Sequence, residues 1–235
     1  MNLQTIFDQL TYGELAQIAL TNEGEGISEA NRARVITNVN LGLTELHKRF
    51  LLKRGTLYVE IQSDQSIYIL DNKYSESNTS SSQPVKFIKD LADPFKNDLL
   101  RIEQVLDATD VEQPLNEHGK TESLFTPSFN KLVFPSNVTE GTYKVVYRAN
   151  HPQLTNIDAM YPPNLVDIQL PETHLEALLY YVASRILNPV GMMNEFHEGN
   201  NYYVKFEDAC QRLENLNFRI DMVEDDDRFC NRGWV

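Results

Sequence analysis

The sequence shows no long hydrophobic run and no visible signal peptide, and it contains few cysteines. The longest uninterrupted apolar stretch, residues 177–183 (ALLYYVA), is far shorter than the ~20 residues that a membrane-spanning helix needs. The opening residues, MNLQTIFDQL, have neither the basic start nor the apolar core of a signal peptide. Cys210 and Cys230 are therefore expected to be free thiols. We expect a soluble protein that is made in the cytoplasm and does not bind membranes.

Signatures of catalysis and of cofactor binding are missing as well. The sequence contains no G-x-S-x-G, no H-E-x-x-H and no G-x-x-x-x-G-K motif. The five histidines are scattered, and the closest cluster of possible metal ligands is Glu195, His197 and Glu198. That cluster lies in a glycine-flanked segment, which holds ligands in place poorly. We expect no enzymatic activity, no catalytic residues, no metal and no cofactor.

Positive charge is scarce. The chain has 34 acidic and 21 basic residues, which give a net charge of −13 at pH 7. Binding to duplex DNA requires clustered Lys and Arg, so this balance argues against a large phosphate-binding surface. The acidity is consistent with simple solubility, or with a surface that nucleic acid passes without sticking.

Apolar residues recur with helical spacing near both ends of the sequence. Leu3, Ile6, Phe7 and Leu10 follow the i, i+3, i+4, i+7 pattern of one helix face. Residues 11–14 (TYGE) have the form of a capping box, which predicts that a second short helix begins there. Residues 191–200 are interpreted as a linker between the last two helices. The predicted helices cover residues 3–10, 11–20, 28–52, 172–187 and about 201–222.

The region between these helices has the period of two that is typical of strands. Residues 74–83 (YSESNTSSSQ) are polar and serine-rich, and we expect a mobile loop tip there. The predicted strands cover residues 56–61, 66–70, 85–88, 99–108, 123–125, 131–134 and 142–149.

These patterns predict an α+β fold, in which a helical bundle is built from both chain ends and a β-rich domain is inserted between them. The first part of the helical domain is predicted at residues 1–54 and its second part at residues 169–223. The β-rich insertion is predicted at residues 55–168, and an extended C-terminal tail at residues 224–235.

Three groups of segments resemble a known family. The first is LTYGELAQIAL (residues 10–20) followed by NLGLTELHKRF (residues 40–50). The second is YRANHP (residues 147–152), which leads through YPP (residues 161–163). The third is Leu170-Pro171 with ALLYYVASRIL (residues 177–187). In order and spacing these segments resemble the head-to-tail adaptor proteins, similar to tail tubular protein A, of short-tailed, T7-like bacteriophages.

The resemblance implies a structural virion protein. Such adaptors form a ring, typically of twelve subunits, beneath the portal protein of the capsid. The ring extends the channel for genomic DNA, without sequence-specific binding, and carries the tail nozzle and fibres. The resemblance thus implies assembly in the host cytoplasm and a final place in the virion tail. Two alternatives stay open: a virion-associated cell-wall hydrolase, and a nozzle or fibre-binding tail component.

The sequence ends in DDDRFCNRGWV, which contains its only tryptophan. Trp and Arg are the residue types that most often anchor protein interfaces, so an exposed Trp at a chain end points to a partner. An acidic run before it would keep the segment extended. The alternative is a tail that is frayed or folded back onto its own helices. The resemblance names the portal as the partner, and the predicted portal-binding residues are Arg228, Phe229, Arg232, Trp234 and Val235.

Overall fold

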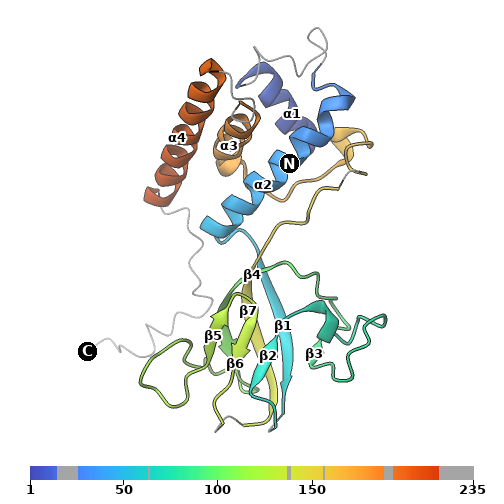
Figure 1. Ribbon diagram of the computed structural model, residues 1–235, viewed down its shortest axis with the longest axis vertical. Coiled ribbons are helices and arrows are strands. Elements are labelled where there is room, and N and C mark those ends of the chain that lie inside the picture. The colour runs from blue at the N-terminus through green and yellow to red at the C-terminus, as the bar shows by residue number, and fades with distance from the viewer. Residues whose placement is uncertain (15–25, 63, 137–138, 156, 188–192, 217–235) are drawn as a thin grey trace, which may run out of the picture.

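A computed structural model describes residues 1–14, 26–62, 64–136, 139–155, 157–187 and 193–216, with backbone alone for residues 193–198 (Figure 1). The helices gather in one half of the molecule and the strands in the other. The chain crosses between the halves where the second helix leads into the first strand, and again where the last strand leads back to the helices. The helices in the described residues are α1 (Leu3–Tyr12), α2 (Glu29–Arg49), α3 (Leu175–Leu187) and α4 (Met193–Asn215).

The first helix begins at a capping side chain and ends at a glycine. The Asn2 carboxamide oxygen accepts a hydrogen bond from the Thr5 amide at 3.0 Å, which caps the free N–H groups of the first turn. The predicted capping box at residues 11–14 is wrong. Thr11 lies inside α1, where its hydroxyl donates to the Phe7 carbonyl one turn earlier at 2.7 Å. The helix ends at Tyr12, and Gly13 is its C-cap.

The apolar core of the helical half is centred on α3, which contacts α1, α2 and α4. Close approach of α2 to α3 requires Gly42, because a Cβ atom there would lie 2.7 Å from Leu178 Cδ1. An extended segment completes this core: Val166, Ile168 and Leu170 are buried against the helices. The Leu3 amide donates to the Val166 carbonyl at 2.9 Å, which ties α1 to that segment.

Two antiparallel sheets form the other half. The order in the four-stranded sheet is β3-β1-β7-β4, and in the three-stranded sheet β2-β6-β5. One apolar cluster is shared by both sheets, and Leu57, Val59 and Ile61 reach it from alternate positions of β1. The strands are β1 (Arg54–Ile61), β2 (Ile67–Ile69), β3 (Ile88–Lys89), β4 (Leu99–Leu106), β5 (Phe125–Ser128), β6 (Lys131–Val133) and β7 (Gly141–Ala149). Short 3-10 turns are η1 (Asn72–Tyr74), η2 (Pro163–Leu165) and η3 (Glu172–His174).

The predicted architecture, a helical bundle built from both chain ends, is wrong. The chain is mixed α+β, with four helices in its described part and two antiparallel sheets, and strands form much of its buried core. The core of the helical half is also not formed by helices alone, because the extended segment at residues 166–170 is packed into it. Periodicity shows which face of each element is apolar, but it does not show what covers that face. The last helix starts at Met193, inside the segment that was predicted as a linker.

The serine-rich loop is anchored more firmly than its composition suggests. The Ser77 amide and hydroxyl donate to the Asp90 carboxylate at 3.0 and 2.6 Å, and the Phe95 amide donates to it at 2.9 Å. Burial by itself would raise the pKa of Asp90, but these hydrogen bonds lower it overall. One charged carboxylate therefore holds the start of the loop against the sheet.

Candidate functional site

The segment that follows β7 is fastened to the side of α2. The Asn40 side chain donates to the Leu154 carbonyl at 2.8 Å and accepts from the Leu154 amide at 3.0 Å. The Asn150 side-chain amide, through Nδ2, donates to the Thr44 hydroxyl at 3.3 Å. Two of the segments that carry the family resemblance, residues 40–50 and 147–152, are thus in direct contact. Their contact fixes where the chain leaves the sheet and enters the helical half.

Three buried histidines line this junction. The rings of His47 and His151 are 5.6 Å apart, and His174 packs edge-on against Phe50 at 4.7 Å. Burial lowers the pKa of all three, and that of His47 to about 4. His47 Nδ1 lies 2.8 Å from the Leu43 carbonyl and His151 Nδ1 lies 2.8 Å from the Pro152 carbonyl, so each neutral ring donates through that nitrogen. These histidines are structural groups that stay neutral at pH 7.

The described residues hold no group of three or more His, Cys, Asp or Glu side chains arranged to bind a metal ion. The side chains of Glu195, His197 and Glu198, the cluster considered from the sequence, lie outside what the structure describes. Cys210 is a free, buried thiol, and burial raises its pKa to about 12. A thiol in that state is a poor nucleophile.

Polar contacts also join the two halves. Lys53 Nζ lies 2.7 Å from Asp98 Oδ2, and the Tyr147 hydroxyl donates to Asp98 Oδ1 at 2.9 Å. Tyr147 lies across Gly55, where a Cβ atom would overlap the tyrosine ring. Arg148 donates to the Lys48 carbonyl at the end of α2 at 2.7 Å. Arg148 therefore ties the sheet to the end of α2 by a hydrogen bond, and the Lys53–Asp98 ion pair holds the chain where it enters β1.

An exposed apolar surface, here called the loop patch, lies on the segment between β7 and α3. It consists of Ile157, Met160, Tyr161 and Leu165, and the side chains of Met160 and Leu165 are 85% and 71% exposed. Turns hold these side chains outward: the Met160 amide donates to the Ile157 carbonyl at 2.9 Å. Single exposed apolar residues are ordinary, but four within nine residues of one loop indicate an interaction surface.

A second exposed apolar surface, the α4 patch, consists of Tyr203 and Val204, which are neighbours on α4 and are 48% and 57% exposed. Arg49 holds this helix in place, because its guanidinium lies 2.6 Å from Glu207 Oε2 and 2.7 Å from Glu214 Oε1. A hollow of about 590 Å³ beside Tyr203 lies among α2, α3 and α4.

The two patches lie on opposite flanks of the helical half. In Figure 1 α4 is at the left edge, and the yellow-orange loop after β7 is at the right edge. One flank therefore carries an exposed apolar loop, and the other carries exposed apolar side chains of α4, of which Tyr203 borders the hollow.

The site residues predicted from the sequence, Arg228, Phe229, Arg232, Trp234 and Val235, all lie outside the described residues. Sequence reasoning missed the loop patch, because its residues follow neither helical nor strand period. Composition was the available signal. Residues 157–165 (IDAMYPPNL) contain two prolines, which are typical of a loop, and yet they are rich in apolar residues.

No protein-family model matches the chain, and no curated protein matches it significantly. Within the described residues, none of the helices is both long enough and apolar enough to cross a bilayer.

Proposed function

We propose that this protein is a head-to-tail adaptor, a structural virion protein that forms a ring between the portal and the tail nozzle. The observation that carries the proposal is the pair of apolar surfaces, the loop patch and the α4 patch, on opposite flanks of the helical half. Contact between two different patches of identical subunits is heterologous, and it produces a closed ring when the rotation between neighbours closes.

Energetics support such a contact. Fully burying a side chain the size of Met or Leu contributes roughly 1.5–3 kcal/mol, so Met160 and Leu165 together are worth several kcal/mol at each interface. A ring repeats that contact at every subunit, although each subunit loses translational and rotational freedom on joining. The net charge of −13 suits a channel wall that DNA passes without adhering.

In this proposal the C-terminal segment attaches the ring to the portal. Phe229 and Trp234 would fill apolar pockets on the portal, and Arg228 and Arg232 would pair with its carboxylates. The terminal carboxylate of Val235 would lie at the end of the contact. Nozzle and fibre proteins would bind on the opposite side of the ring.

The decisive experiment uses tail-less capsids that display the portal. The variant Met160→Ser/Leu165→Ser should bind with at least tenfold lower apparent affinity and leave no complete rings in negative-stain images. Its free energy of unfolding should change by less than about 1 kcal/mol, because both side chains are exposed. The matched control, Leu91→Ser/Val111→Ser, removes two other exposed apolar side chains, both from the β half, and should form normal rings.

Removal of residues 225–235 tests the portal contact separately. The truncated protein should keep its melting temperature and lose stable attachment to capsids. Wild-type rings formed by the Met160/Leu165 variant would refute the ring contact, and wild-type attachment of the truncated chain would refute the role of the tail.

A lysis zymogram on bacterial cell wall distinguishes the hydrolase alternative.

A further inference from the structure

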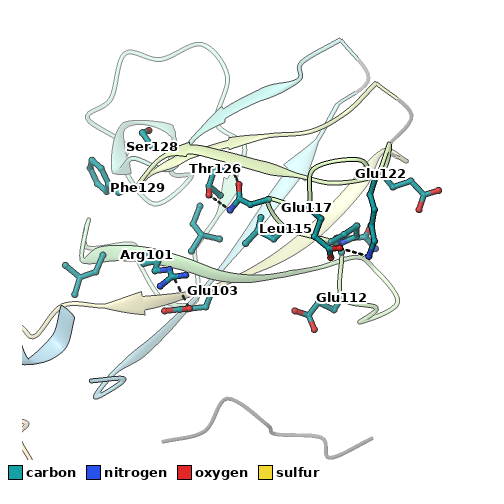
Figure 2. Close-up of a pocket in the computed structure, with 15 residues that line it drawn as sticks. Arg101, Glu103, Glu112, Leu115, Glu117, Glu122, Thr126, Ser128 and Phe129 are labelled. Atoms are coloured by element: carbon teal, nitrogen blue, oxygen red, sulfur yellow. Dashed lines mark hydrogen bonds and ion pairs between the residues drawn. The ribbon is translucent and has the colours of Figure 1, made fainter. Parts of the chain in front are cut away.

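A hollow of about 1130 Å³ lies in the β half, along one side of β4. Its walls are β4 at residues 100–103, the segment at residues 112–117, and the turn of the β5–β6 hairpin (Figure 2). Pockets for small molecules are typically 300–1,000 Å³, so this hollow is larger than most of them. We call it the β4 groove.

The groove exposes an unpaired strand edge. In the sheet order β4 is the last strand, and it pairs with β7 on one side only. The later part of its outer edge is covered, because the Gln113 amide donates to the Val105 carbonyl at 2.8 Å. Among the described residues, nothing is hydrogen-bonded to the outer edge at residues 100–103. Four residues of strand offer about 13 Å of edge.

The facing wall does not compete for that edge. Thr126 on β5 is already satisfied: its amide donates to Asn116 Oδ1 at 2.9 Å, and its hydroxyl accepts from Asn116 Nδ2 at 2.8 Å. At this point of the facing wall the Asn116 side chain takes the backbone N–H, whereas residues 100–103 of β4 have an open row of backbone groups among the described residues.

Negative charge is concentrated at one end of the groove. Figure 2 shows Glu112, Glu117 and Glu122 there, and Phe129 at the other end. Lys120 Nζ lies 2.7 Å from Glu117, which neutralises that carboxylate. No cation of the described chain lies within ion-pair distance of Glu112 or Glu122. At the edge itself, Arg148 Nε lies 3.0 Å from Glu103.

We propose that the β4 groove binds an extended, basic segment of another protein, which adds to β4 as a further strand. Main-chain hydrogen bonds to residues 100–103 would provide affinity, as in other cases of strand addition. Lys or Arg side chains of the segment would meet Glu112 and Glu122, and an apolar side chain would cover the exposed ring of Phe129. This surface belongs to the β half, so the proposal does not depend on the ring contact.

Charge favours a different protein over a second copy of this chain. Two β4 grooves face to face would bring two sets of unpaired glutamates together, and juxtaposed like charges cost free energy. The register of β4 against β7 also shifts after Leu99 and again after Ile102. Such bulges twist an edge strand, which hinders its pairing with the same edge of a second copy.

The probe is a labelled nine-residue peptide, Lys-Val-Lys-Thr-Lys-Val-Lys-Thr-Phe, whose binding is followed by fluorescence anisotropy at 50 mM salt. Two further peptides carry N-methyl groups at the odd or at the even residues. Only alternate residues of an added strand turn their N–H groups toward β4. One methylated peptide should therefore bind like the parent, and the other about tenfold more weakly.

Protein variants test the charge contact. Glu112→Gln/Glu122→Gln should weaken binding of the parent peptide about fivefold, and Glu29→Gln/Glu172→Gln, which removes two exposed glutamates of the helical half, should not. Equal binding of the two methylated peptides would overturn strand addition, and so would a failure of the parent peptide to bind at 1 mM. A dimer of the free protein that the peptide dissociates would show that the groove holds a second copy, which would overturn the choice of partner.

Discussion

His47 is buried at the junction of the two halves, and its burial makes stability depend on pH. Its pKa is about 4 in the folded protein and 6.5 in the unfolded chain, because burial disfavours the charged ring. As the pH falls, the unfolded chain therefore binds the proton first. The contribution of His47 is fully present above about pH 6.5 and is lost as the pH falls to about 4. We expect acidification over that range to cost roughly 3 kcal/mol of unfolding free energy from this residue.

Urea unfolding at pH 7.5, 6.0, 5.0 and 4.5 measures this loss. His47→Gln is the test variant, because a glutamine side chain carries no titrating group and can still donate toward the Leu43 carbonyl. The variant is expected to be less stable at pH 7.5 and to lose clearly less stability on acidification than the parent protein. Parallel profiles of stability against pH for the two proteins would show that His47 is not the source of the pH dependence. His151 and His174 have lowered pKa values too, so the stability of the variant should still depend on pH to some extent.

At the scale of elements, Arg49 determines how firmly α4 is held against α2. Its guanidinium pairs with Glu207 and Glu214, and the side chains of Arg49 and Glu214 are mostly buried. Arg49→Gln would leave these two carboxylates near each other without a cation. We expect a loss of about 1–2 kcal/mol in unfolding free energy, because charge-assisted pairs at partly buried positions exceed ordinary surface pairs.

Lys48→Gln is the matched control, since Lys48 is the neighbour of Arg49 on α2 and pairs with Glu45 at an exposed position. That variant should lose less than about 0.5 kcal/mol. Hydrogen exchange should also show faster exchange of α4 amides in the Arg49 variant than in the Lys48 variant. Equal stability of the two variants would contradict a special role for Arg49.

At the scale of the whole molecule, net charge opposes assembly. In the proposed ring each subunit would carry −13, so neighbouring subunits would repel each other, and salt screens such repulsion over about 10 Å at 0.1 M. Raising NaCl from 50 to 500 mM should strengthen ring formation on capsids, whereas it should weaken binding of the basic peptide to the β4 groove. Binding titrations at the two salt concentrations check both trends. Weaker ring formation at high salt would indicate a contact dominated by opposite charges and not by the apolar patches.

The sequence by itself determined the apolar faces of most elements. Val39, Leu43 and Leu46 recur with helical spacing, and all three are buried on one face of α2. Leu57 and Val59 alternate with exposed neighbours, as a strand covered on one face requires. Such patterns are local, because the period of side chains along a helix or strand is set by backbone geometry alone.

Only the tertiary structure decided what those faces cover. β1 and β2 are neighbours in sequence, yet they belong to different sheets. Asn40 pairs with Leu154, 114 residues away, and the extended segment at residues 166–170 takes a place in the helical core. The loop patch and the β4 groove likewise depend on contacts that no local pattern contains. The physical reason is that hydrophobic burial is non-directional, so any element that packs against an apolar face stabilises the fold. Which element packs there is decided by close packing and hydrogen bonding across the whole chain.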